Sequence, residues 1–201
     1  MIAALVLAAG ASRRMGTENK LLLSWRGQPL VTSVVRTLVG SRAQEVIVVL
    51  GHEADRVRAV LPGLGERVVE NPDWSKGMTT TIQRGARTAT EQASGLMVCL
   101  CDQPLMEVKD YDFLIEHFEE KRRVDPRCII VPTFAERRGN PVLFSAAFKP
   151  QILAHSQVHG CRDILADSRQ HVHEVAMPND HIHRDIDTQE AYLGLLNPLG
   201  H

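Results

Sequence analysis

The sequence has no excess of charge of either sign, because 23 Lys and Arg residues stand against 24 Asp and Glu residues. It therefore lacks the broad basic field that attracts nucleic acid or an anionic membrane, and an anionic ligand must be bound by a local site. A long apolar run is absent too: residues 1–11, the longest, reach about half the length of a membrane-spanning helix. Neither nucleic acid nor a membrane is expected as a partner.

Cysteine is scarce. The four cysteines include no Cys-x-x-Cys pair, which favours free thiols in a reducing compartment over a disulfide framework. A secretion signal is not indicated, because Arg13 and Arg14 follow the N-terminal apolar run, whereas a signal peptide carries its positive charges before it. A cytoplasmic protein is expected.

The composition is that of a globular domain, with 44% hydrophobic and 23% charged residues among 201. These values argue against intrinsic disorder and against a coiled coil. A chain of this length buries roughly 70% of its unfolded surface, which is enough for one stable domain. No repeat, low-complexity tract or linker is visible, so all strands are expected to share one sheet.

Aliphatic runs alternate with segments of helical periodicity. The aliphatic runs, typical of strands buried on both faces of a parallel sheet, occupy residues 2–7, 45–50, 95–100 and 128–131. The helical segments occupy residues 29–39, 55–61, 79–90 and 109–122. The alternation predicts an α/β domain with a mostly parallel twisted sheet, helices on both faces, and ligands at the carboxyl ends of the strands.

The last third of the chain is less regular. A strand is predicted at 142–144, after a turn at 139–141, and a short helix follows at 146–153. The remaining elements predicted from the pattern are short strands at 171–175 and 182–187 and a final helix at 188–195.

The loop after the first strand, residues 7–20, contains two glycines, a serine, two arginines and a lysine. Small residues let the backbone approach a ligand, successive N–H groups can surround phosphate oxygens, and the cations neutralise charge. The loop matches neither the P-loop pattern nor G-x-G-x-x-G. An anion-binding loop is predicted, with a flexible polar loop as the alternative.

A second small-residue element begins at Gly77 and continues with threonines at 79–81. It predicts the start of a helix, where free N–H groups and hydroxyls can hold a base, ribose or phosphate. The alternative is that the threonines simply cap this helix.

Two aspartates are candidate metal ligands. Asp102 follows the third predicted strand, where a carboxylate can hold Mg²⁺ together with phosphate oxygens and water; capping the next helix is the alternative. In an extended strand, Asp187 would share one face with His181, His183 and Asp185. There it either caps the last helix or reaches Asp102 as a second magnesium ligand.

Zinc and covalent catalysis are disfavoured. The pairs His171/His173 and His181/His183 come with no HExxH motif or cysteine pair. Cys101 has no histidine near it in the sequence to activate a nucleophilic thiol.

The loop at 7–20, Leu-Ala-Ala-Gly-Ala-Ser-Arg-Arg-Met-Gly-Thr-Glu-Asn-Lys, resembles the LAAGxSxRMGxxK signature of the MobA-like NTP transferase family. The resemblance implies a Rossmann-like, GT-A-like fold and a loop that wraps the triphosphate of an NTP. Three residues, where the signature has two, separate the last glycine from the lysine. The residues implicated in nucleotide binding are Leu7, Ala8, Ala9, Gly10, Ser12, Arg14, Gly16 and Lys20.

Further motifs extend the resemblance over nearly the whole chain. Residues 71–82 resemble the N-x-x-W-x-x-G-M-x-x-S-I element, which adds Gly77, Met78 and Thr81 to the nucleotide site. The Cys-Asp-Gln-Pro sequence at 101–104 and the alanine at position 9 are the forms that accompany cytidylyl transfer in this family, which implies CTP as the nucleotide. Residues 185–192 resemble the closing D-I-D-T-x-E-D-Y motif.

An acceptor site is implied by similarity to the family's G-[HN]-P-V-L-F element. Another element, G-D-x-G-A-R, is matched less well, because Gln157 and Val158 replace its Gly-Asp. The candidate acceptor-binding residues are Arg138, Gly139, Asn140, Pro141 and Arg162.

The resemblance implies Mg²⁺-dependent transfer from CTP to molybdopterin, a phosphorylated pterin, with release of pyrophosphate and a molybdenum hydroxylase or dehydrogenase as recipient of the product. Arg14 and Lys20 would stabilise pyrophosphate, and Asp102 would hold the metal, with Asp187 as its second ligand. Residues 1–105 would bind the nucleotide and residues 106–201 the acceptor, within one domain.

Two alternatives stay open at this stage. One is the same chemistry on another acceptor, such as a sugar phosphate, methylerythritol phosphate or phospholactate. The other is a non-catalytic partner that binds a cofactor or nucleotide for delivery.

Overall fold

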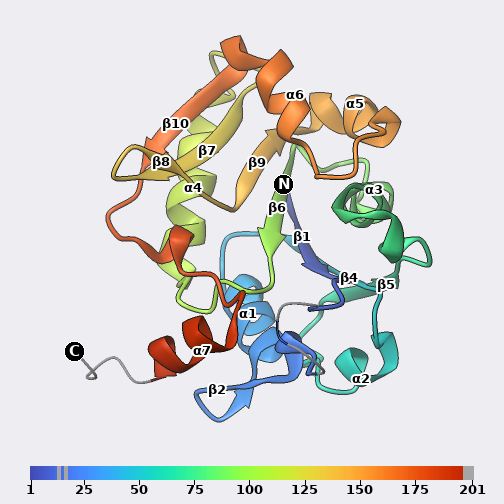
Figure 1. Cartoon of the computed structure of the whole chain (residues 1–201). Coiled ribbons are helices and arrows are strands. Elements are labelled where there is room, and N and C mark those ends of the chain that lie inside the picture. Colours follow the sequence, from blue (N-terminus) through green and yellow to red (C-terminus); the bar gives the residue numbers. More distant parts are fainter. Residues whose placement is uncertain (13–14, 16–17, 197–201) are drawn as a thin grey trace.

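The computed structural model describes residues 1–12, 15 and 18–196. Its main sheet has eight strands, seven of them in the order β10-β7-β9-β6-β1-β4-β5, with β8 paired to β7 (Figure 1). The strands are β1 (Ile2–Ala8), β4 (Glu45–Leu50), β5 (Arg67–Glu70), β6 (Gly95–Leu100), β7 (Ile129–Phe134), β8 (Arg137–Arg138), β9 (Val142–Ser145) and β10 (Val172–Ala176). The pairs around β1 are parallel, whereas β9 is antiparallel to both of its neighbours.

Helices cover both faces of this sheet, as the alternating pattern predicts. The α-helices are α1 (Leu30–Val39), α2 (Ala54–Arg58), α3 (Met78–Thr88), α4 (Val108–Lys121), α5 (Lys149–Ala154), α6 (Arg162–Asp167) and α7 (Gln189–Leu196). Alternate residues of β1 point to opposite faces: Ala4 and Val6 join a core with α1 and α4, and Ala3 and Leu5 join one with α3. The result is a mostly parallel, Rossmann-like α/β fold.

Two expectations about the strands are wrong. Residues 182–187 form no strand; His181–His183 is a 3₁₀ turn and the chain continues as a loop. The alternating pattern instead reflects the burial of Ile182 and Ile186 in two different apolar clusters. The strands also do not all share one sheet, because β2 (Ser24–Trp25) and β3 (Gln28–Pro29) form a separate small hairpin.

Other differences are local. The strand predicted at 128–131 continues past Pro132, which the sheet accommodates within β7. The helix predicted at 146–153 is divided into a 3₁₀ turn at Ala146–Phe148 and α5. Neither β5 nor α6 was predicted, because both are short and have few consecutive apolar residues.

Two findings bear on the setting of the protein. Across the described ranges, no helix is both long and apolar enough to span a bilayer. All four cysteines are buried and free, as their spacing predicts.

Candidate active site

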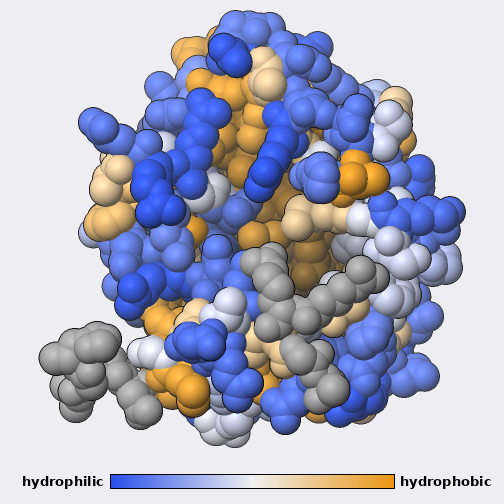
Figure 2. All heavy atoms as spheres, in the orientation of Figure 1, coloured by the Kyte–Doolittle hydropathy of each residue, from blue (hydrophilic) through white to orange (hydrophobic). Residues whose placement is uncertain are grey.

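A cavity of about 430 Å³ opens where β1 and β6 end, at the edge of the sheet where a ligand site is expected. Figure 2 shows it as a hollow near the middle of the molecular face, with an apolar floor bordered by polar side chains. The lining residues are Leu7, Ala9, Gly10, Ala11, Ser12, Met15, Lys20, Leu21, Trp74, Ser75, Gly77, Met78, Thr81, Leu100, Cys101, Asp102 and Asp187.

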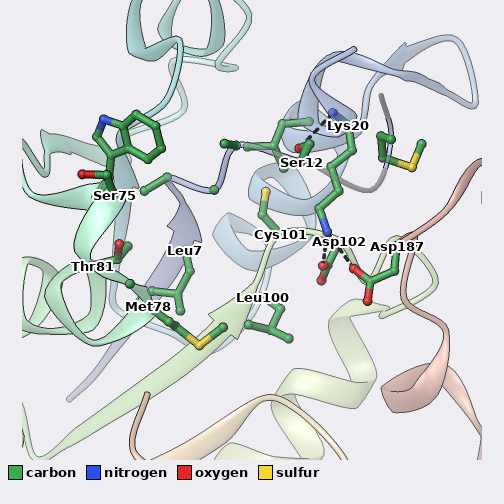
Figure 3. Close-up of a pocket in the computed structure, with 17 residues that line it drawn as sticks. Leu7, Ser12, Lys20, Ser75, Met78, Thr81, Leu100, Cys101, Asp102 and Asp187 are labelled. Atoms are coloured by element: carbon green, nitrogen blue, oxygen red, sulfur yellow. Dashed lines mark hydrogen bonds and ion pairs between the residues drawn. The ribbon is translucent and has the colours of Figure 1, made fainter. Parts of the chain in front are cut away.

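One side of the cavity carries a lysine between two carboxylates (Figure 3). Nζ of Lys20 lies 2.5 Å from Oδ2 of Asp102 and 3.1 Å from Oδ1 of Asp187. Burial opposes the charge on Lys20, but the charges and hydrogen bonds of Asp102 and Asp187 outweigh it and raise the lysine pKa. Lys20 therefore stays protonated and places a positive charge between the two carboxylates.

The first loop is folded to place Lys20 there. The backbone N–H of Lys20 donates to Oγ of Ser12 at 3.2 Å, and Ser12 has a left-handed φ of 49° that turns the chain back. Asn19 caps the 3₁₀ turn Lys20–Leu22 by accepting a hydrogen bond from Leu21 N at 3.1 Å. The extra residue before Lys20, relative to the family signature, does not keep the lysine out of the site.

Asp187 comes from the far end of the sequence and is brought in by the loop after β10. The N–H of Ile186 donates to the carbonyl of Asp102 at 2.8 Å, which ties this loop to the end of β6. Asp185, two residues before Asp187, is half-buried; its burial and the charge of Asp102 raise its carboxyl pKa. Of the two readings of Asp187, the structure favours proximity to Asp102, since Thr188 caps the last helix through Ala191 N.

The acidic pair suits a hard cation held jointly with a phosphate. Oδ1 of Asp102 is buried and has no hydrogen-bond partner among the residues that the structure describes, so this carboxylate oxygen could serve as a ligand. Mg²⁺ is commonly held by one or two carboxylates together with substrate phosphates and water. Within the part of the chain that the structure describes, no group of three or more His, Cys, Asp or Glu side chains is arranged to bind a metal. A site shared with a substrate therefore fits better than an all-protein cage.

The zinc and thiol alternatives find no support in the geometry. His171 and His173 both contact the carboxylate of Asp125, at 3.1 Å. Cys101 lines the cavity, but burial, together with the charge of Asp102, raises its pKa far above the ordinary thiol range. A buried neutral thiol is a poor nucleophile.

The opposite side of the cavity is formed by the start of α3. Gly77, Met78 and Thr81 line it, as the motif implies. The expectation of free N–H groups and hydroxyls is only partly met, because Met78 N donates to Val158 O at 3.1 Å. The hydroxyl of Thr79 bonds the backbone of the 157–160 loop.

The side chain of Asn71 holds the neighbouring threonines by hydrogen bonds. Its side-chain amide donates to the hydroxyls of Thr80 and Thr81 at 2.9 and 3.1 Å, and it is itself buried. The threonines therefore fasten the loop to the helix, and Thr81 in addition reaches the cavity.

Several lining residues were not singled out from the sequence. Trp74, Ser75 and Leu100 are among them. Ser75 lies across the cavity from Lys20, and Leu100 lies between the two sides beside Leu7, which the motif had already implicated (Figure 3). The tryptophan of the N-x-x-W element was the available signal. Trp74 also meets His52 edge-on, with ring centroids 5.2 Å apart.

The acceptor-binding candidates lie apart from the cavity lining. Arg138, in β8, pairs with Glu174 at 2.7 Å, and Arg162 is exposed at the start of α6. Gly139 packs so closely that an added Cβ would lie 2.8 Å from the carbonyl of Ile182. Asn140 and Pro141, joined by a cis peptide bond, lead into β9.

Of the remaining nucleotide-binding candidates, Ala9, Gly10 and Ser12 line the cavity, whereas Ala8 is buried in β1 and does not. Arg14 and Gly16 lie outside the described residues.

Comparisons with known proteins identify the family and support the fold. Residues 4–175 match the MobA-like NTP transferase domain. The chain is 29% identical to nicotine blue oxidoreductase of Paenarthrobacter nicotinovorans, over 97% of this chain and 96% of that protein. It is also 29% identical to the purine catabolism protein PucB of Bacillus subtilis, over 92% and 91% of the two chains.

Among solved structures, Rv0371c of Mycobacterium tuberculosis is similar with a TM-score of 0.82 and 28% identity, covering 98% of this chain and 97% of that one. A complex of Rv0371c with manganese matches with a TM-score of 0.78 and 26% identity, covering 98% and 99%.

Proposed function

The chain belongs to the MobA-like NTP transferase family and is a nucleotidyltransferase, and from this premise we propose that it transfers a cytidylyl group from CTP to molybdopterin with Mg²⁺ as cofactor. The observation that carries the proposal is the convergence of Lys20, Asp102 and Asp187 beside the small-residue loop after β1. CTP is supported by Ala9 and by the Cys-Asp-Gln-Pro sequence, and molybdopterin by the resemblance of the motifs.

In the proposed reaction, a phosphate oxygen of the acceptor attacks the α-phosphorus of CTP. The new P–O bond forms as the bond from the α-phosphorus to the bridging oxygen breaks, and that oxygen leaves with pyrophosphate. A phosphate monoester is largely ionised at neutral pH, so the residues need only position the groups and neutralise charge. The metal, when bound, supplies positive charge at the reacting phosphate, and Asp102 and Asp187 would hold it.

Lys20 has a second task in this scheme. Its ammonium group is protonated and can turn from the carboxylates to the triphosphate, where, together with Arg14, it would stabilise the leaving pyrophosphate. Ala9, Gly77 and Thr81 would border the base and ribose. We assign residues 1–105 mainly to the nucleotide and residues 106–201 mainly to the acceptor, with Arg138, Gly139, Asn140, Pro141 and Arg162 as its candidate contacts.

The cellular setting is part of the proposal. The four free, buried cysteines support a reducing compartment such as the cytoplasm. A molybdenum hydroxylase or dehydrogenase would receive the product.

The test is release of pyrophosphate when the protein is incubated with Mg²⁺, molybdopterin and each of the four NTPs in turn. Release with CTP supports the proposal. Release with CTP only when a sugar phosphate, methylerythritol phosphate or phospholactate replaces molybdopterin overturns the acceptor assignment. Nucleotide binding without release with any acceptor favours a delivery protein, and turnover of a redox substrate without pyrophosphate favours the kind of activity for which the Paenarthrobacter relative is named.

A further inference from the structure

Gln103 follows Asp102 directly, yet its side chain turns away from the cavity. It is 2% exposed and is not among the lining residues. Its Nε2 donates two hydrogen bonds of 2.8 Å, one to the carbonyl of Ile182 and one to Oδ1 of Asp185. The amide thus joins the end of β6 to a segment about 80 residues further along the chain.

That segment carries Asp187 and is not part of the sheet. Figure 1 shows it in red, crossing the end of β6 on its way to α7. Among its polar attachments to the residues directly after β6 are the two bonds from Gln103 and the bond from Ile186 N to the carbonyl of Asp102. The amide of Gln103, bonded to Ile182 and Asp185, therefore helps to set the position of the second carboxylate relative to the first.

The chemistry of this position calls for a hydrogen-bond donor. Asp185 is half-buried and close to the charges of Asp102 and Asp187, so it needs a donor to hold it in place. A thioether would leave Asp185 and the Ile182 carbonyl without a partner, and a carboxylate would add repulsion. Glutamine supplies two N–H bonds with no charge.

We propose that Gln103 is a positioning residue, which holds Asp185 and Ile182 so that Asp187 stands beside Asp102 as half of a divalent-cation site. The inference deepens the proposed function and rests on it. It also assigns to Gln103 a role in cation affinity rather than in recognition of the nucleotide base, because its side chain is buried and its Nε2 already bonds Ile182 and Asp185.

The test compares the full-length wild type with Gln103→Glu and with Gln103→Met, using Gln92→Glu and Gln92→Met as matched controls on an exposed glutamine. Mn²⁺ alone is the probe, and its binding is measured from the electron spin resonance signal of the free ion. We expect the Gln103 variants to bind Mn²⁺ roughly 10- to 100-fold more weakly, as is usual when a residue that orients a metal ligand is lost, and the controls to match wild type.

A swapped pair gives the sharper test. In Gln103→Glu combined with Asp185→Asn, donor and acceptor exchange places and the net charge is unchanged from wild type. This double variant should recover part of the lost affinity, which a general loss of stability would not do. Thermal unfolding of every variant identifies any that fail to fold. The swapped pair and the two single variants each give a separate comparison of Mn²⁺ affinity with wild type.

Pyrophosphate release then gives a second readout. The Gln103 variants should need more Mg²⁺ for half-maximal rate, recover most of the rate at high Mg²⁺, and keep the wild-type preference between CTP and GTP. Wild-type Mn²⁺ affinity in the Gln103 variants, no recovery in the swapped pair, or a changed base preference would overturn the inference. If the wild type releases no pyrophosphate, the proposed function fails, while the Mn²⁺ comparison still decides the role of Gln103.

Discussion

The ammonium group of Lys20 lies 2.5 Å from the carboxylate of Asp102, although the two residues are 82 positions apart in the sequence. The same group lies 3.1 Å from Asp187, 167 positions further along the chain than Lys20. Three segments that share no local pattern thus meet at one charged point, at the side of a cavity large enough for part of a nucleotide.

Asp102→Asn should lower the rate of pyrophosphate release about 100-fold or more, the usual cost of removing a preorganised charge from a site. The measurement is the initial rate with saturating CTP and acceptor. Asp167→Asn, at an exposed position in α6, is the control and should retain the wild-type rate. Full activity in Asp102→Asn at ordinary Mg²⁺ would remove this residue from the mechanism.

Lys20→Met should change two quantities in opposite directions. Turnover should fall by about 100-fold, because the proposed role of Lys20 is to neutralise charge on the leaving pyrophosphate. Binding of Mn²⁺ to the nucleotide-free protein should tighten, because the ammonium group no longer competes for the two carboxylates. Lys121→Met, on the exposed end of α4, should change neither. Weaker Mn²⁺ binding in Lys20→Met would contradict the assignment.

Trp74 should report nucleotide binding. The chain has two tryptophans, of which Trp25 is 2% exposed in an apolar cluster and Trp74 lines the cavity. Titration with CTP and Mg²⁺ should change the intrinsic fluorescence, and Trp74→Phe should abolish the change. Trp74→Ala should also weaken CTP binding roughly tenfold, the value of one aromatic contact. A full response in Trp74→Phe would place the nucleotide elsewhere.

Gly77→Ala should lower thermal stability and weaken CTP binding by more than its backbone strain alone would. Gly77 has a φ of 117°, and an added Cβ would lie 2.7 Å from the carbonyl of Val158, which accepts the first N–H of α3. Gly65 has a φ of 101°, and a Cβ added there would meet nothing within 4 Å, so Gly65→Ala carries similar strain without the contact. The midpoint temperature of thermal unfolding and the affinity for CTP should both be lower in Gly77→Ala than in Gly65→Ala. Equal effects in the two variants would argue against a role for the contact with Val158.

The lowered pKa of Asp110 predicts that the stability of the protein depends on pH. It is 1% exposed; burial opposes its charge, but hydrogen bonds from His181, Asn179 and the backbone of Glu107 outweigh it and lower its pKa. Since the folded pKa lies below the unfolded one, this contribution is complete above the ordinary aspartate range near pH 4 and is lost as the pH falls through the lower, folded value.

Asp110→Asn should therefore reduce the free energy of unfolding at pH 7 by about 1–3 kcal/mol, with the difference from wild type shrinking below about pH 4. Denaturant titrations at pH 7 and pH 3 measure it. A difference that is the same at both pH values would show that the charge of Asp110 contributes nothing.

The sequence predicted the sheet and its helices well because each long element has its own periodicity of apolar residues. It also predicted, through motif resemblance, that Lys20, Asp102 and Asp187 belong together. The loop course of residues 184–188 was missed, because the burial of Ile182 and Ile186 imitates the alternation of a strand. The partners of Gln103 were also beyond sequence reasoning, since nothing local encodes a hydrogen bond to a carbonyl 79 residues away.

The late attachment of Asp187 has a consequence for biosynthesis. Every strand that the structure describes ends by Ala176, so the residues that build the sheet all precede the segment that carries Asp187. A product cut short by premature termination after β10 would keep the residues of every strand and Lys20, yet lack one of the two carboxylates and the buried Ile182 and Ile186. The segment after β10 is thus what would complete the proposed cation site.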